Sequence, residues 1–458
     1  MIIKYLKLGL KPTIKVVTSL LLLFVTIGNA QDLSLKQAHQ LMLISNGDLR
    51  ASHFEVQAAN EEKKAVKGLY YPSVEISGSY LNLDKDIDVD LNSQRDLVGG
   101  LLQIPNPAAV LGNWQYTIQD KNFGFATTNV NWPIYAGGKI KAANEAAKIR
   151  LDLSENQHLI KEDKFTINLI AYYFKLKLAK AAQRLRIDIY NTIQLHYNNA
   201  EKLFQNGLIP EVETLNAKVA LSNAKRELLG AQKDVALAKT AVKNLVGGAS
   251  FNTISTLFIT PIILPPLEEI QEEMLSKNKL LNQIEQNYDL AKIGLKVENS
   301  EYFPKVALFG MHLLWKDNLP LIDTKWMAGV GLKWGLFNGF QREHKIRASK
   351  YKISQVQEIE KQAHLNIRTY TEKLYSNIQK QQEQYESLNA DEILANKLKF
   401  MRTRAFEEGT GTSLEVIDAT LKLTEIKLYK LKALYEYNIT YGELMVHLGK
   451  TETFLNQN

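Results

Sequence analysis

The chain has 458 residues, 45% of them hydrophobic, and no cysteine, so it can fold around a sizeable core without disulfides or thiol chemistry. Its formal charge of +7 falls to +3 when the four lysines of the first fifteen residues are left out. This nearly balanced remainder gives no support for nucleic-acid binding.

The first thirty residues predict an export signal. A lysine-bearing start leads into the apolar run VVTSLLLLFVTI (16–27) and then the small residues GNA (28–30). This order is typical of a secretory signal peptide, and the apolar run is shorter than the roughly 20 residues that a spanning helix needs. We expect residues 1–30 to be cleaved off after Ala30, with a retained anchor as the less favoured alternative.

The rest of the chain contains two copies of one plan. WPIYAG (132–137) matches WGLFNG (334–339) at an offset of 202 residues, and YYPSV (70–74) matches YFPKV (302–306) at an offset of 232. The change of offset places a 30-residue insertion in the first copy, between its two strands. We therefore expect one repeat over 31–248 and a second over 249–458.

Each copy predicts the order helix, strand, loop, strand, long helix, glycine break, helix. The first helix opens at Ser34 and Gln37, which have capping-box spacing, and runs to about Tyr70. The helical pattern from Gly138 to Asn206 contains no proline and would span roughly 100 Å. We expect two shorter helices, stacked end to end, to pair with it, and the segment 247–266 to link them.

The strands are predicted at about 72–80, 123–135, 304–315 and 325–337. They alternate between apolar residues and small or polar ones, although Phe309 and Met311 fall on the polar face. An apolar outer face and a polar inner face are typical of a transmembrane barrel, but an ordinary half-buried sheet alternates in the same way.

Tryptophan favours the membrane interpretation. All five tryptophans lie in these strands or their loops, and none lies in the longer helical sections. Indole rings favour the membrane–water interface, whereas tryptophans of a soluble core would be scattered. The expected interface aromatics are Trp132, Trp315, Trp326 and Trp334.

These features together resemble the TolC family of outer-membrane efflux proteins over about residues 31–450. The resemblance rests on YPSV with FPKV, WPIYAGG with WGLFNGF, and the tips NGLIPEVETLNA (206–217) and EGTGTSLEVIDA (408–419). It implies an α+β membrane protein that forms a homotrimer, with a 12-stranded transmembrane β-barrel continuous with a periplasmic α-helical barrel. Because four strands cannot close a barrel and open edges do not persist in lipid, oligomerisation also follows if the strands span the membrane.

The two glycine breaks are expected to be turns between helices, at about 206–211 and 408–413. Gly409 suits the left-handed residue after a helix, Thr412 and Glu415 have capping-box spacing, and Pro210 suits a first helical turn. The resemblance implies that both tips dock a periplasmic adaptor, whereas a plain connection is the alternative. The expected docking residues are Gly207, Leu208, Ile209, Pro210, Gly409, Thr410, Gly411, Thr412 and Ser413.

The resemblance also implies a periplasmic gate next to the tips. Glu415 and Asp418 match the family's ring of acids and share a helix face because they are three residues apart. Where the family's prototype closes the gate with a tyrosine and an arginine, this chain has Phe406 and Gly411. Glu213 still matches an acidic partner, so we expect closure to rest on Phe406 or on contacts that the sequence does not identify. Solvated surface acids are the alternative.

No pattern in the sequence indicates catalysis, a cofactor or a metal site. The eight histidines are scattered without metal-ligand spacing, and no Walker motif is present, so energy must come from a partner. Asp84, Asp86, Asp88 and Asp90 alternate within the insertion 81–121. We interpret this run as a solvated loop in preference to a cation site.

The sequence therefore predicts a passive exit duct of a tripartite efflux or type I secretion system, in the outer membrane of a Gram-negative bacterium. The expected partners are two further copies of the chain, outer-membrane lipid, a periplasmic adaptor (membrane fusion protein) and an inner-membrane pump of the RND, ABC or MFS type. The alternative is a periplasmic coiled-coil adaptor or scaffold that does not span the membrane. The two equivalent hairpins and the tryptophans in the strands argue against that alternative.

Overall fold

The computed structural model describes residues 32–320 and 324–457, so the predicted signal peptide lies outside the described residues. The chain divides into two compact units, and each unit takes segments from both predicted repeats. Two long helices, α6 (Lys139–Gln205) and α10 (Gln341–Glu407), contribute to both units. Of the described residues, the helical unit comprises 32–54, 157–281 and 363–457, and the strand unit comprises 55–156, 282–320 and 324–362.

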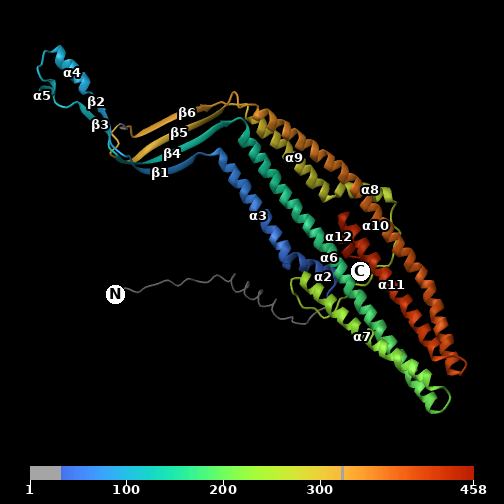
Figure 1. Cartoon of the computed structure of the whole chain (residues 1–458). Coiled ribbons are helices and arrows are strands. Elements are labelled where there is room, and N and C mark those ends of the chain that lie inside the picture. Colours follow the sequence, from blue (N-terminus) through green and yellow to red (C-terminus); the bar gives the residue numbers. More distant parts are fainter. Residues whose placement is uncertain (1–31, 321–323, 458) are drawn as a thin grey trace, which may run out of the picture. The chain divides into compact units, whose positions relative to one another are not determined.

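The helical unit holds the main hydrophobic core. Tyr173 and Phe174 of α6 and Tyr437 of the last long helix are among its largest fully buried side chains. Besides α6, this core includes residues of α10 and of α2 (Leu35–Ser45), α7 (Glu211–Leu245), α8 (Leu267–Lys277), α11 (Ser413–His447), which carries Tyr437, and α12 (Thr451–Leu455) (Figure 1).

The link between the two copies runs through this core without forming a helix. Asn438 accepts a hydrogen bond from Ile259 N (2.8 Å) and donates one to Ile259 O (3.0 Å). The Tyr437 hydroxyl accepts one from Ile262 N (3.0 Å), and the Tyr173 hydroxyl accepts one from Thr256 N (3.0 Å). Because buried backbone groups need partners, these side chains allow an extended segment to lie between helices.

The first helix of the first copy is interrupted, contrary to the sequence interpretation. The helix α2 ends at Ser45, and α3 (Gly47–Lys67) begins after Asn46, followed by a 3-10 turn over Gly68–Tyr70. The Asn46 side chain accepts hydrogen bonds from Asp48 N (3.0 Å) and Leu49 N (3.2 Å). These bonds satisfy free N–H groups at the start of α3, which is the role of an N-cap.

The second copy repeats this break. The helix α8 ends at Lys277, and α9 (Lys279–Ser300) begins after Asn278. The Asn278 side chain accepts hydrogen bonds from Leu280 N (2.9 Å) and Leu281 N (3.4 Å). The sequence interpretation of one continuous helix was therefore wrong in both copies, at asparagines that occupy equivalent positions.

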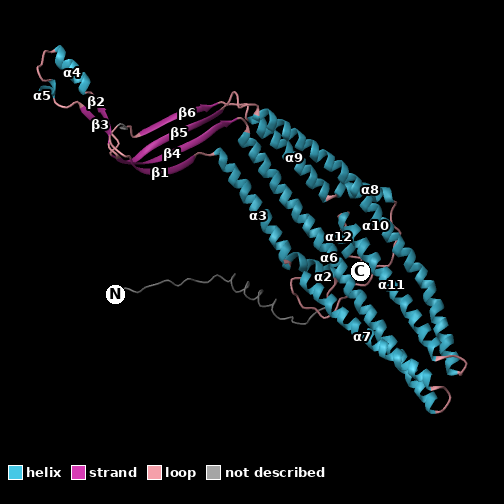
Figure 2. Ribbon diagram, in the orientation of Figure 1, coloured by secondary structure: helices cyan, strands magenta, loops and turns pink. Residues whose placement is uncertain are grey.

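The strand unit contains one four-stranded antiparallel sheet in the order β1-β4-β5-β6 (Figure 2). The central pair joins the first copy to the second, and no strand of the described residues pairs with the outer edges of β1 and β6. The last strand ends at Lys333, before the expected 337. The bounds are Ser73–Asn82 for β1, Asn122–Ala136 for β4, Lys305–Asp317 for β5 and Trp326–Lys333 for β6.

The strand register places the apolar residues on one face. Trp132 pairs with Leu308, which pairs with Val330, and all three are exposed. The next row, on the polar face, joins Asn131, Phe309 and Gly329. A Cβ added at Gly329 would lie 2.9 Å from the Phe309 ring. The phenylalanine that breaks the alternation therefore covers a glycine of the neighbouring strand.

The insertion is a folded ribbon instead of the expected loop, although its four alternating aspartates are exposed, as expected of a solvated segment. Asp88 accepts hydrogen bonds from Thr117 Oγ1 (2.7 Å) and Gln115 Nε2 (3.1 Å), so one acid of the alternating run meets two donors of the opposite strand. Its elements are β2 (Ile87–Asp90), α4 (Asn92–Leu101), α5 (Pro107–Leu111) and β3 (Gln115–Gln119).

Across residues 32–320 and 324–457, the helices lack a stretch with the length and apolar character needed to cross a bilayer.

Replacing Asn46 with alanine should lower the free energy of unfolding by about 0.5–2 kcal/mol. The substitution removes the cap of α3, and it also removes the donor to Leu245 O (3.3 Å). Chemical denaturation of the purified protein measures the change. The matched control is Asn198→Ala at an exposed position within α6. Equal midpoints for the two variants would contradict the capping role.

Candidate channel tips and gate

The two hairpin turns end their first helices in the same way. Gly207 has φ +69° and Gly409 has φ +74°, both in the left-handed region that favours glycine. Gly207 N donates to Phe204 O (2.8 Å), and Gly409 N donates to Phe406 O (3.1 Å). In each copy the N–H of the residue after the glycine also donates a hydrogen bond to a backbone oxygen in the last turn of the preceding helix, as in a Schellman motif. The sequence prediction of a left-handed glycine is confirmed at Gly409, and Gly207 has the same backbone conformation.

The second helix of each hairpin begins differently in the two copies. Thr412 Oγ1 accepts from Glu415 N (3.3 Å), and Glu415 Oε2 accepts from Thr412 N (3.1 Å), which completes the expected capping box of α11. Pro210 is the N-cap of α7 and lies just before its first turn, one residue earlier than expected.

Most of the expected docking residues lie at the surface. Leu208 is 68% exposed, Ile209 is half-buried against the neighbouring helices, and Ser413 is completely buried. The Ser413 side chain is therefore not available to a partner. The exposed members of the set are Gly207, Leu208, Pro210, Gly409, Thr410 and Thr412, and Gly411 is half-buried.

Ser413 joins the two hairpins of the chain. Its backbone N–H donates to Glu213 Oε2 of α7 (2.8 Å), and its hydroxyl lies 2.6 Å from His196 Nε2 of α6. Burial lowers the pKa of His196, and the carboxylate of Glu213 opposes this shift. The neutral imidazole is therefore favoured at neutral pH. We call His196, Glu213 and Ser413 the hairpin latch.

Phe406 completes this contact with an apolar cluster. It is 4% exposed and packs with Ala200 of α6, Ala217 of α7 and Val416 of α11. The centroids of the Phe406 and His196 rings are 4.7 Å apart. The phenylalanine therefore fills the space between the hairpins, so they are held by a buried ring together with the latch.

The two acids expected at the gate have different environments. Glu415 forms an ion pair with Arg402 of α10 at 2.8 Å, in addition to its capping bonds. Asp418 is exposed and forms no ion pair within the described parts of the chain. Arg402, which the sequence analysis did not single out, therefore neutralises one of the two carboxylates.

Two of the four expected interface tryptophans fix strand ends to helix ends. Trp132 Nε1 donates to Tyr70 O (2.9 Å), and Trp334 Nε1 donates to Tyr302 O (3.0 Å). The duplicated motifs thus make the same contact twice. The rings of all four remain substantially exposed, including those of Trp315 and Trp326.

Lowering the pH should open the hairpin latch, because protonation of buried His196 opposes the packed state. When folding lowers the pKa of a histidine, the folded state loses stability as the pH falls below the ordinary histidine pKa of about 6.5. Spin labels on Leu208→Cys and Thr410→Cys, in a chain without other cysteines, should move apart between pH 7.5 and 5.5.

The variant His196→Gln should remove most of this pH response. Its matched control is His39→Gln, at a second buried histidine with a burial-lowered pKa, whose Nε2 contacts Thr166 Oγ1. A pH response that survives in the His196 variant and disappears in the His39 variant would show that the latch does not titrate.

The comparison of sequences identifies a family. The profile of the family described as outer membrane efflux protein matches residues 38–248 and 270–450. Outer membrane efflux protein BepC of Brucella suis biovar 1 (strain 1330) is 23% identical over 211 residues, which cover 46% of this chain. The match spans 40% of the length of BepC.

Solved structures show the same fold. The outer membrane protein VceC of Vibrio cholerae matches with a TM-score of 0.72 and 16% identity, over 91% of this chain and 96% of VceC. The CmeC channel of Campylobacter jejuni matches with 0.71 and 15%, over 91% and 86%. The open state of the MtrE channel of Neisseria gonorrhoeae matches with 0.63 and 12%, over 93% and 94%.

The family match covers most of the chain, and the structural matches agree with the observed order of helices and strands. They confirm the fold and the outer-membrane localisation that the duplicated motifs indicated, in a family of transport channels rather than enzymes. The chain belongs to the outer membrane efflux protein family, that of TolC.

Proposed function

We propose that this chain forms the exit duct of a tripartite efflux or type I secretion system, as a trimer whose sheets close one 12-stranded barrel. The open sheet carries this proposal. Every residue of β1 is exposed, and Val74, Ile76, Val330 and Leu332 present apolar side chains to the surroundings. A chain on its own leaves both this face and two strand edges uncovered.

The physics of lipid favours closure by further copies. Unpaired backbone N–H and C=O groups each cost several kcal/mol in hydrocarbon, so an open sheet edge is not stable there. The edges of β1 and β6 can pair with each other between copies, because each copy offers one of each. The exposed rings of Trp132, Trp315, Trp326 and Trp334 would then suit the membrane–water interfaces.

Exposed apolar residues on α10 support the same assembly. Leu394, Leu398 and Met401 are spaced by four and three residues, Ile393 and Phe400 by seven, and all five are exposed on one side of the helix. Such a stripe normally packs against another helix. We assign this one to a neighbouring copy, so that the helices of three chains would enclose a tunnel.

A second apolar surface lies near the tips and would receive the adaptor. Leu208, Val212, Leu215 and Val219 are exposed at successive spacings of four, three and four residues. Val219 also borders a groove of about 320 Å³ between α6, α7 and α11. Apolar residues at this spacing can seat a partner helix, so we assign the surface to the helical hairpin of a periplasmic adaptor.

Opening of the duct at its tips would then require the two hairpins of one chain to separate. An adaptor helix bound beside Val219 would lie next to Ala217 and Ala220, which pack against the neighbouring helices. The latch and Phe406 would resist this movement, and the inner-membrane pump would supply the energy. With Glu415 paired to Arg402, Asp418 would contribute the ring of acids at the constriction.

Purified protein in detergent should have the mass of three chains and should form ion-conducting pores in planar bilayers. Val330→Lys, on the apolar face, should cost about 2–4 kcal/mol near the bilayer midplane and reduce insertion. Ser79→Lys lies on the opposite face of the sheet and should insert normally. A monomer that stays dispersed without detergent, or equal insertion of both variants, would overturn the proposal.

A photoreactive residue at Val219 should capture a periplasmic protein with a helical hairpin, identified by mass spectrometry. The matched position is Leu237, which is also exposed on α7 but lies five turns farther from the tip. Capture of the same adaptor with equal yield at both positions would contradict docking at the tip groove.

A further inference from the structure

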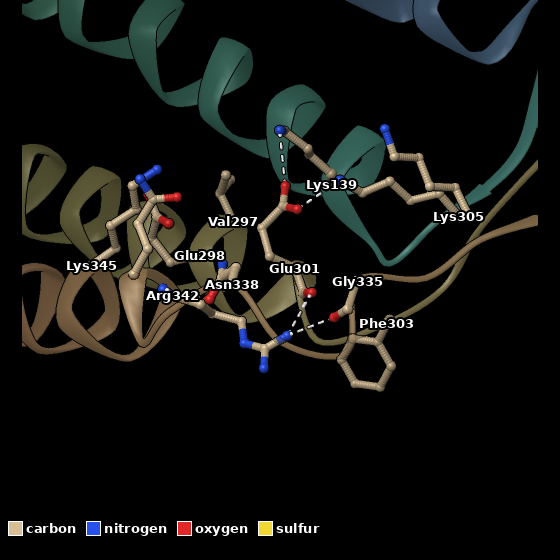
Figure 3. A pocket seen from close by; sticks show the side chains of 12 residues that line it. Lys139, Val297, Glu298, Glu301, Phe303, Lys305, Gly335, Asn338, Arg342 and Lys345 are labelled. Atoms are coloured by element: carbon tan, nitrogen blue, oxygen red, sulfur yellow. Dashed lines mark hydrogen bonds and ion pairs between the residues drawn. The ribbon is translucent and has the colours of Figure 1, made fainter.

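A cavity of about 260 Å³ lies in the strand unit, where β5, β6, α9 and α10 come together beside the first turn of α6 (Figure 3). Basic side chains dominate its lining, with Glu298 and Glu301 as the only acids among the lining residues. The basic residues are Lys139, Lys305, Lys333, Arg342 and Lys345.

Glu301 neutralises only part of this charge. Its carboxylate lies 3.3 Å from Lys139 Nζ and 2.7 Å from Lys305 Nζ, as Figure 3 shows. The bond from Lys305 lowers the pKa of Glu301, so this acid is ionised at neutral pH. Within residues 32–320 and 324–457, Lys333 and Lys345 form no ion pair.

The strand register adds to the unbalanced charge. Lys305 and Lys333 are directly opposite each other on β5 and β6. Like charges at such positions destabilise a sheet, and a shared anion would remove that cost. Even when Glu343 is counted with the two lining acids, the five cations leave an excess of two positive charges.

Arg342 contributes a buried donor without a partner. It is 9% exposed, its guanidinium stacks on the Tyr302 ring at 3.8 Å, and its Nη1 donates to Glu301 O (3.3 Å) and Gly335 O (3.1 Å). Its Nε has no hydrogen-bond partner in the described structure. A buried N–H without a partner is destabilising, so an acceptor bound at Arg342 Nε would stabilise the site.

The register also decides which face of the sheet the cavity adjoins. Along β5, Lys305 alternates with Val306 and shares its face with Ala307 and Phe309. This is the polar face, whereas Val306 and Leu308 belong to the face with Trp132. A lipid headgroup would approach from the apolar face, so the polar face favours a dissolved anion.

We propose that this cavity binds an anionic solute through a carboxylate or phosphate group. Lys333 and Lys345 supply the charge, and Arg342 supplies the buried donor. The position of this site on the inner wall of a channel rests on the proposed function. Anion binding itself requires only the residues of the strand unit. Each copy in an assembly would carry one such site.

The test is calorimetric titration of the full, detergent-solubilised protein with inorganic phosphate and with citrate, at low salt. Wild type should bind, and Lys333→Gln with Lys345→Gln should weaken binding about tenfold, since each lost charge pair is worth up to about fivefold. The control is Lys350→Gln, on the same helix but outside the cavity lining. No binding by wild type, or an equal loss in the control, would overturn the proposal.

Two further arms identify the source of the anion. Dihexanoyl phosphatidylglycerol that binds where phosphate and citrate do not would overturn the solute assignment in favour of a headgroup. In bilayers, the double lysine variant should shift the reversal potential in a potassium chloride gradient toward cation selectivity. Absence of pores would contradict the proposed function and would leave the calorimetric result standing.

Discussion

The open edges of the four-stranded sheet are the constraint on which the interpretation of the molecule depends. Backbone groups along β1 and β6 need hydrogen-bond partners, and in hydrocarbon no water can provide them. Each copy carries one edge of each kind, so identical chains can satisfy one another around a ring. The proposed assembly would explain the exposed stripe on α10 in the same way, because a neighbouring chain would cover it.

In the proposed duct, the hairpin latch would provide a closure that needs neither the tyrosine nor the arginine of the family's prototype. Ser413 has no exposed surface, and its two polar groups meet Glu213 and His196 of the other hairpin. Phe406 adds apolar contact, as the sequence analysis expected of one of its two alternatives. Buried hydrogen bonds and ring packing are less sensitive to salt than surface ion pairs, so this closure differs physically from one made by exposed charges.

Local features of the fold were predictable from the sequence, and features that join distant segments were not. The left-handed conformation of Gly409 and the two capping boxes depend on a few neighbouring residues, and the structure shows them as expected. The break at Asn46 could have been predicted, because an asparagine also occupies the equivalent position of the second copy, Asn278. The apolar periodicity continues across both positions, so the sequence was interpreted as one continuous helix in each copy. The contact of Ser413 with His196 joins residues 217 positions apart, and the unpaired donor of Arg342 depends on packing, so neither has a local pattern.

The two charged sites oppose each other in sign, and this bears on what the duct could select. Asp418 stands in the helical unit without an ion pair among the described residues, whereas Lys333 and Lys345 are uncompensated in the strand unit. In the proposed duct, an acidic constriction would favour cations, and a basic site would favour anions where they bind. A solute with both charges could be attracted at both sites. Selectivity then depends on the distribution of charge along the path, which the nearly balanced net charge of the chain conceals.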